Sequence, residues 1–163
     1  MYKRQGDVVT VPHDDALNLG HQFTLEAWFK SDGGGTLFQK GSSFPPAYQI
    51  EVRGNSLSLA SPSVLGINGF DTLEAADVIT TGKWYHVAAV VDRISGNMLI
   101  YLNGNKVAEK TIQVNDTLAS TEDGFFGRDS NGFGFEGALD NVQIWRVVRT
   151  AEQIRNDLQL ASV

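Results

Sequence analysis

Two apolar stretches in the second half of the chain constrain its fold more than any other feature. The first, Trp84–Asp92, is rich in β-branched and aromatic residues and ends in a charged turn. The second, Met98–Leu102, alternates in polarity and leads directly into Asn103-Gly104. An Asn-Gly pair tolerates the positive φ angles of a tight hairpin turn. The two stretches therefore predict neighbouring strands of an antiparallel sheet.

The same kind of pattern recurs along most of the chain. In Phe23–Lys30, residues at every second position are apolar, which predicts a strand with one face in a core. Residues 61–83 show no clear strand pattern, and a loop of that length is often functional. The remaining strands, separated by turns rich in Gly and Asn, are expected at Val8–Val11, Thr36–Lys40, Tyr48–Arg53, Ser56–Ala60, Lys106–Ile112, Gly124–Gly127 and Leu139–Val147.

A short helix is expected at the C-terminal end. Thr150 can cap it, and Gln153 stands at the reciprocal position of a capping box. Ile154 and Leu158 fall on one face of that helix. The helix therefore serves packing rather than function.

Composition and charge limit the partners. At 163 residues the chain most simply forms one domain, residues 1–163. Its formal net charge of −6 disfavours nucleic acid and anionic membranes, which need a basic surface. No apolar run reaches membrane-spanning length, and the lack of cysteine excludes disulfides and thiol chemistry. The abrupt start predicts a module of a larger protein, with any targeting signal outside this chain.

Four segments in a fixed order resemble laminin G-like domains of the concanavalin A-like jelly-roll family. The resemblance spans nearly the whole chain and implies an all-β, antiparallel β-sandwich of jelly-roll type with a short C-terminal helix. Because this fold hosts many activities, it does not identify a ligand. The segments are Val8–Pro12, Phe23–Lys30 (F-T-x-E-A-W-x-K), Trp84–Gly104 (W-x-H-V-A, then L-Y-L-N-G) and Gly137–Trp145 (G-x-I-D-x-V-x-I-W).

The chain lacks the patterns that known catalytic chemistries require. Related jelly-roll glucanases carry carboxylates two and four residues apart on one strand, so that an acid and a nucleophile share a cleft. Glu26 and Glu51 each stand alone in their strands. The three histidines have no metalloprotease spacing, and there is no G-x-S-x-G turn. Gly132–Gly137 fits G-x-G-x-x-G, but a strand rather than a helix should follow, which argues against nucleotide binding. We expect no enzyme activity.

Asp140 is the candidate metal ligand. The resemblance implies a structural Ca²⁺ held by the matching aspartate with oxygen ligands from the first strand, which would be Gly6 and Asp7. The cations Lys3 and Arg4 stand where the family has an acidic element. The alternative is that Asp140 only hydrogen-bonds its neighbours. A second calcium site at the rim could use Asp71, Asp123, Asp129 and Asn131, although such residues are common in any turn.

Aromatic residues in loops are the candidate ligand contacts. Sugar rings stack on exposed aromatic faces, while Asp, Asn and Arg bond the hydroxyl groups. The alternative for each ring is that it fills an end of the sandwich. The ligand-binding candidates are Phe44, Tyr48, Phe70, Asp71, Arg128, Asp129, Asn131 and Phe133, with Arg53 as a further donor.

These observations predict a non-catalytic recognition or adhesion module, extracellular or on the cell surface, that binds a glycan or a protein. Loops at the sandwich rim would make the contacts, with Ca²⁺ bracing the scaffold. One alternative is a structural accessory domain without a ligand. The other is a polysaccharide hydrolase or lyase with an unfamiliar catalytic set.

Overall fold

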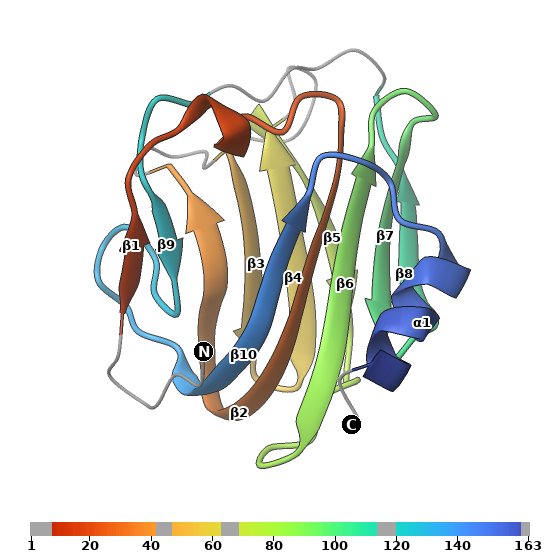
Figure 1. Ribbon diagram of the computed structural model, residues 1–163. Helices are drawn as coiled ribbons and strands as arrows, with labels where there is room; N and C mark the ends of the chain where they lie inside the picture. Colours follow the sequence, from red (N-terminus) through yellow and green to blue (C-terminus); the bar gives the residue numbers. More distant parts are fainter. Residues whose placement is uncertain (1–7, 42–46, 63–68, 114–119, 161–163) are drawn as a thin grey trace.

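Two antiparallel sheets packed face to face form the molecule (Figure 1). A computed structural model describes residues 8–41, 47–62, 69–113 and 120–160. Sheet A contains, in order, β10 (Glu136–Trp145), the first half of β2 (Gln22–Lys40), β6 (Trp84–Asp92), β7 (Asn97–Leu102) and β8 (Asn105–Thr111). Sheet B contains β1 (Val9–Val11), β9 (Gly124–Phe126), the second half of β2, β3 (Tyr48–Arg53), β4 (Ser56–Pro62) and β5 (Phe70–Ala75).

Strand β2 belongs to both sheets. Its residues 22–30 pair with β6, and its residues 35–40 pair with β3 and β9. Two separate strands were predicted here, but the chain stays extended through a bend at Gly34 and Gly35, whose φ angles are 106° and 110°. A Cβ atom at Gly35 would lie 2.6 Å from the carbonyl oxygen of Gly134. Only glycine allows both this backbone and this close approach.

The core lies between the two sheets and follows the predicted alternation. In β2, Phe23, Leu25, Ala27 and Phe29 are all buried in it. A fully buried side chain of the size of Phe23 contributes about 2–3 kcal/mol. Sheet B supplies the opposing layer, with Ile50, Val52, Leu57, Leu59 and Leu73.

The hairpin prediction is confirmed, whereas one strand was missed. Strands β7 and β8 pair across Asn103 and Gly104, whose φ angles are 48° and 75°. Strand β5 lies inside the stretch where no strand was expected, and it pairs with β4. The inward-facing residue at position 71 of β5 is an aspartate. Its Oδ2 lies 3.7 Å from Nη1 of the buried Arg93. That charged pair interrupts the apolar alternation on which the prediction depended.

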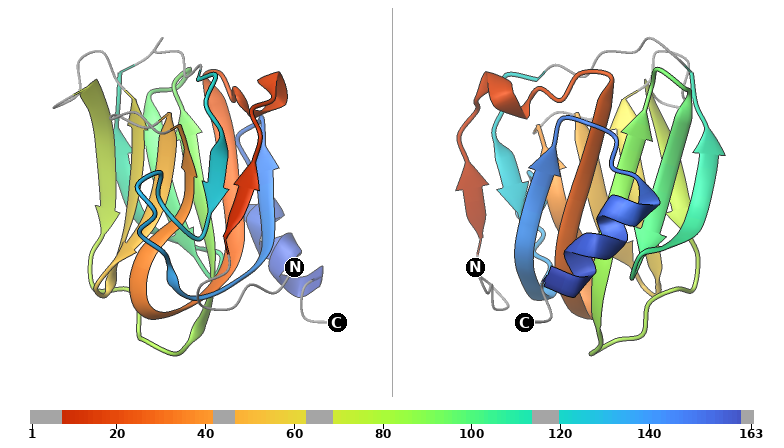
Figure 2. Two further views of the ribbon diagram at one scale, coloured as in Figure 1. Left: turned by 90° about the vertical axis from the view of Figure 1, so that its left-hand side faces the viewer. Right: turned by 45° about the vertical axis from the view of Figure 1, so that its right-hand side comes forward.

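The C-terminal helix α1 (Ala151–Leu160) covers part of the outer face of sheet A (Figure 2). The capping box is confirmed: the Gln153 backbone N–H donates to Thr150 Oγ1 at 3.2 Å, and the Thr150 N–H donates to Gln153 Oε1 at 2.8 Å. Ile154 is fully buried in a second small apolar cluster with Ala88, Val90 and Tyr101. A single-turn 3-10 helix, Asp15–Leu17, follows β1. Among the described residues, no helix has the length and apolar character to cross a membrane.

Candidate functional site

The loop of residues 128–134, between β9 and β10, holds an exposed aromatic ring in a defined conformation. Asp129 Oδ1 accepts hydrogen bonds from the backbone N–H groups of Asn131 and Phe133, at 2.9 and 2.8 Å. The Asp129 N–H donates to the Phe133 carbonyl at 3.0 Å. Arg128 and Gly134 form a β-bridge that closes the loop. The Asp129 carboxylate thus sets the loop backbone around the Phe133 ring.

Phe133 is the most exposed large apolar side chain among the described residues, at 74%. A single exposed apolar residue is common on protein surfaces and by itself indicates nothing. Here the ring stands on a loop whose backbone is already hydrogen-bonded, so a ligand would not have to order it. That pre-organisation lowers the entropy cost of binding.

Arg128 anchors the base of this loop. Its guanidinium lies 4.8 Å from the centre of the Phe125 ring on β9, and its Nη2 lies 3.4 Å from Thr10 Oγ1 on β1. A guanidinium over an aromatic face is an attractive arrangement worth about 0.5–1 kcal/mol at exposed sites. Arg128 is therefore held next to the loop, and only part of it faces solvent.

The outer face of sheet B continues the surface beyond the loop. Gln39 Nε2 donates to Ser130 Oγ at 3.0 Å and to the Gly41 carbonyl at 2.7 Å, which joins β2 to the loop. Gln49 Nε2 donates to Thr36 Oγ1 at 3.1 Å. We call the loop together with the outer-face residues Gln49, Glu51 and Arg53 the candidate binding surface. Thr36 and Gln39 are buried, at 4% and 5% exposure, and support that surface through their hydrogen bonds. Figure 2 (left) shows the loop beside the sheet B half of β2.

A charged pair lies on β3 in this surface. Arg53 Nη2 lies 2.5 Å from Glu51 Oε1, and the Arg53 side chain is largely exposed. The Arg53 donor predicted from the sequence is thus on the same sheet as the amides of Gln39 and Gln49. The Gln49 amide, which is held by Thr36, and a charged pair beside an aromatic ring form the mixed lining typical of ligand sites.

The other predicted ligand contacts do not join this surface. Tyr48 is fully buried: its ring packs against Phe23 and Phe38, and its hydroxyl donates to the Leu17 carbonyl at 2.9 Å. Burial raises the pKa of the Tyr48 hydroxyl above its usual range. The prediction of a stacking ring is therefore wrong for Tyr48, and the alternative, a ring that fills the sandwich, is the one observed.

Asp71 is also turned inward. Its Oδ1 lies 3.2 Å from Lys110 Nζ, and the buried Arg93 lies on its other oxygen. The Asp71 carboxylate therefore links β5 to Arg93 and Lys110 by ion pairs and does not form part of a loop surface. Phe70 begins β5 opposite Pro62, while Phe44 lies outside the described residues.

The calcium ligands predicted from the sequence lie only partly within the described residues. Asp140 Oδ1 accepts the Asn141 N–H at 2.8 Å, and its predicted co-ligands Gly6 and Asp7 lie outside the described part of the chain. Asp123 accepts the His13 N–H at 2.9 Å. No group of three or more acidic, His or Cys side chains suited to a metal occurs among the described residues. Ca²⁺ needs six to eight oxygen ligands, so Asp140 as a ligand stays a prediction.

A second polar cluster lies beneath helix α1, on the outer face of sheet A. His86 Nε2 and Arg149 Nε approach the two Glu26 oxygens at 3.4 and 3.5 Å, and all three groups are largely buried. Arg149 also pairs with Asp157 of the helix. Burial raises the pKa of Glu26 to about 7, with Arg149 opposing it, and burial lowers the pKa of His86 to about 4. The cluster joins helix and sheet, and sequence reasoning did not find it.

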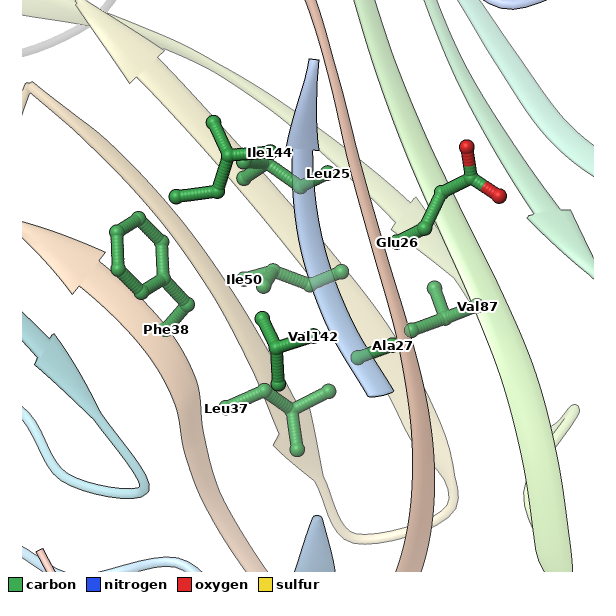
Figure 3. Close-up of a pocket in the computed structure, with 9 residues that line it drawn as sticks. All are labelled: Leu25, Glu26, Ala27, Leu37, Phe38, Ile50, Val87, Val142 and Ile144. Atoms are coloured by element: carbon green, nitrogen blue, oxygen red, sulfur yellow. The ribbon is translucent and has the colours of Figure 1, made fainter. Parts of the chain in front are cut away.

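A small apolar cavity lies between the sheets (Figure 3). Leu25, Leu37, Ile50 and Val142 are among its lining residues, and the Glu26 carboxylate points away from them. Its volume is about 10 Å³, which is near the minimum for one water molecule. It is a packing gap and not a ligand pocket.

These features together define an all-β jelly-roll sandwich with a pre-formed loop surface. The chain belongs to the concanavalin A-like lectin/glucanases superfamily, whose laminin G-type family model matches residues 3–155. The resemblance and the fold class inferred from the sequence are thereby confirmed.

Two mouse proteins are similar in sequence. The chain is 30% identical to the pentraxin-related protein PTX3 of Mus musculus, over 73% of this chain and 33% of that protein. It is 24% identical to pappalysin-1 of Mus musculus, over 84% of this chain and 10% of that protein. The chain thus spans a third or less of the curated relatives it matches.

Similar solved structures confirm the fold. A proposed carbohydrate-binding protein from Bacteroides ovatus has a TM-score of 0.74 at 20% identity, covering 94% of this chain and 45% of that one. The receptor-binding domain of botulinum neurotoxin mosaic serotype C/D has a TM-score of 0.73 at 17% identity, covering 94% and 40%. A heptameric SAP-like pentraxin from Limulus polyphemus has a TM-score of 0.65 at 18% identity, covering 94% and 73%.

Proposed function

We propose that this domain is a non-catalytic recognition module that binds a glycan or a protein through the candidate binding surface. The observation that carries the proposal is the exposed Phe133 ring on a loop fixed by Asp129. An aromatic face buries a large apolar area at a small cost in conformational entropy. Similar proteins described as carbohydrate-binding or receptor-binding support this class of function.

The composition of the surface favours an extended ligand over a small enclosed one. The accessible side chains beside the loop are the Gln49 amide and the Glu51–Arg53 pair, which suit hydroxyl-rich or peptide ligands. The cavity between the sheets is too small for such ligands. A module of this kind would act outside the cell or on its surface, and fractionation of the source cells tests that location.

A glycan array and a set of extracellular-matrix proteins, probed with the wild-type domain, test the proposal. Phe133→Ala should weaken any binding about tenfold or more, as expected for a central aromatic contact worth at least 1.4 kcal/mol. Ile94→Ala is the matched control, since Ile94 is 66% exposed on the turn after β6 and outside the surface. Equal loss in both variants, or binding that ignores Phe133→Ala, would contradict the proposal. A lack of binding to every ligand tested would favour a structural accessory domain.

A hydrolase is the second candidate function, because sheet B brings two carboxylates onto one face. Glu51 pairs with Ser58, and Ser58 pairs with Glu74. Strands lie about 4.8 Å apart, which places the two Cα atoms about 10 Å apart. Glycosidases use two carboxyl groups separated by about 5–10 Å. Release of reducing sugars from polysaccharides, lost in both Glu51→Gln and Glu74→Gln, would establish this activity in place of the proposed one.

Calcium bracing belongs to the same proposal and has its own test. A metal bound only by the folded state raises the melting temperature, and the rise grows with the logarithm of the metal concentration above the dissociation constant. If Asp140 is a ligand, Ca²⁺ should raise Tm relative to EDTA, and Asp140→Asn should reduce that difference. Identical melting curves in Ca²⁺ and EDTA would remove Asp140 from the list of metal ligands.

A further inference from the structure

The tip of the candidate binding surface carries an Asn-Gly pair in an open environment. Asn131 and Gly132 are both exposed, and a Cβ atom built at Gly132 would have no other atom within 4 Å. Within the described part of the chain, the Asn131 carboxamide makes one hydrogen bond, from Nδ2 to Asp129 Oδ2 at 3.4 Å. The Gly132 N–H donates to the Asp129 carbonyl at 3.3 Å. Both distances lie at the weak end of hydrogen bonding.

A second Asn-Gly pair in the same molecule is held much more firmly. In the β7–β8 hairpin, Asn103 Oδ1 accepts the His86 N–H at 2.9 Å, and the Asn103 N–H donates to the His86 carbonyl at 2.8 Å. A Cβ atom at Gly104 would lie 2.6 Å from Arg155 Cγ, because helix α1 packs against the turn. Of the two Asn-Gly pairs that lie wholly within the described residues, the one at Asn131 is weakly held and the one at Asn103 is firmly held. Asn68 of a third pair lies outside the described residues.

We propose that Asn131 is a site of spontaneous covalent modification, in which its carboxamide is converted to a carboxylate. The Gly132 backbone nitrogen loses its proton to solvent and attacks Asn131 Cγ, forming a five-membered succinimide as ammonia leaves. Water then opens either carbonyl of the ring and gives an aspartyl or an isoaspartyl residue. Glycine favours the attack because it has no Cβ to obstruct the nitrogen and its backbone rotates freely. No partner beyond water is required.

The two Asn-Gly pairs should react at different rates because different hydrogen bonds must break before each asparagine can react. At Asn103 the carboxamide must leave its bond to His86 before it can turn toward the Gly104 nitrogen, and the turn must open against helix α1. Each of these bonds adds to the barrier at Asn103. At Asn131 the two reacting groups, the carboxamide and the Gly132 N–H, make only long contacts, at 3.4 and 3.3 Å, although the Asn131 and Phe133 N–H groups remain bonded to Asp129 Oδ1. The modification should therefore be at least about tenfold faster at Asn131, since 1.4 kcal/mol corresponds to a factor of ten in rate.

The product would alter the loop that carries Phe133. An isoaspartyl residue routes the backbone through the former side chain and adds one atom between Asn131 and Gly132. That atom would shift the Phe133 N–H relative to Asp129 Oδ1, and either product adds a negative charge beside Asp129. Where the loop binds a ligand as proposed above, the aged form would bind more weakly. The chemistry itself does not depend on that function, because it is detected on the protein alone.

Peptide mapping of the aged domain tests the proposal. The folded protein is incubated at mildly alkaline pH and sampled over weeks, and each peptide is examined for a gain of about 1 Da and for isoaspartyl residues by enzymatic methylation. The peptide with Asn131 should convert at least about tenfold faster than the peptide with Asn103. Asn131→Gln should abolish the fast conversion, because glutamine would have to form a larger, slower ring.

A denatured sample supplies the control for sequence effects. In concentrated urea both pairs lose their folded environment, so their rates should converge, with Asn103 accelerating the more. Convergence in urea together with a large difference in the folded state supports the proposal. Equal rates in the folded protein, a stable Asn131, or a difference that persists unchanged in urea would each overturn it.

Discussion

The Asp129 carboxylate fixes the conformation of the loop backbone that holds the Phe133 ring in solvent. It accepts two backbone N–H groups in the loop, and a third hydrogen bond joins the same residue to the Phe133 carbonyl. Such local side-chain bonds to the backbone are the reason why Asp is favoured in turns. The sequence predicted Asp129 as a ligand contact or metal ligand, whereas its oxygen Oδ1 is committed to the loop itself.

Asp129→Ala should release the loop without unfolding the domain. The loss of hydrogen bonds in a partly exposed loop costs about 1 kcal/mol, while cleavage at exposed, loosened segments rises sharply. Chymotrypsin should therefore cut after Phe133 faster in Asp129→Ala than in the wild type. Asp129→Asn keeps an acceptor oxygen and should restore resistance. Equal cleavage of all three proteins would show that Asp129 does not fix the loop.

The pair Glu26 and His86 predicts a specific dependence of stability on pH. The raised pKa of Glu26, about 7, adds stability at low pH that is lost as pH rises from about 4.5 to 7. The lowered pKa of His86, about 4, adds stability above about 6.5 that is lost as pH falls toward 4. Between about pH 4.5 and 6.5 the two effects have opposite slopes and nearly cancel.

Glu26→Gln should uncover the contribution of His86. With only His86 titrating, the free energy of unfolding of the variant should fall by roughly 2–3 kcal/mol from pH 6.5 to 4.5 relative to the wild type. Urea denaturation at several pH values measures this difference directly. Parallel pH curves for the two proteins would mean that the two groups do not titrate in this way.

Among the elements, those with local signals were predicted well. The β7–β8 hairpin depends on Asn103-Gly104, and helix α1 begins at a capping box whose two residues are only three positions apart. Strand β5 was missed because Asp71 occupies an inward position, and its partner Arg93 lies in a different part of the chain. Tyr48 was misplaced for a related reason, since nothing local shows that its ring meets Phe23 and Phe38.

The capping box of α1 can be tested with a pair of substitutions. Thr150→Ala removes the oxygen that accepts the Gln153 N–H and should lower the free energy of unfolding by about 1 kcal/mol. Thr150→Ser retains that oxygen and should remain near the wild type. Chemical denaturation of both variants gives the comparison. Equal destabilisation by Ala and Ser would show that the methyl group, not the cap, matters.

On the scale of the whole molecule, the bend of β2 connects the core to the candidate binding surface. Gly35 lies against Gly134 at the base of the loop, so the path of β2 and the position of Phe133 depend on each other. The loop residues Arg128, Asn131 and Phe133 were predicted, since a glycine-rich aromatic loop is visible locally. Gln39 and Gln49 were not predicted. The sequence alone does not show which polar residues of different strands lie side by side, because that depends on the register of the strands.

Gly35→Ala should be much more harmful than Gly54→Ala. Both glycines have positive φ angles, 110° and 57°, but a Cβ at Gly54 meets open space whereas one at Gly35 meets backbone atoms. The φ strain alone costs about 1–3 kcal/mol, and the clash at Gly35 adds to it. Thermal melting should separate the two variants clearly. Similar melting temperatures would mean that the loop moves aside freely.

Strand β2 belongs to both sheets, so one continuous segment of backbone connects the two layers of the sandwich. A pulling force along β2 would be shared among the hydrogen-bonded ladders that it forms with β6, β10, β3 and β9, which would have to shear together. The layers therefore cannot be peeled apart one at a time from that strand. This arrangement should give the sandwich resistance to a force applied along β2 without any cross-link.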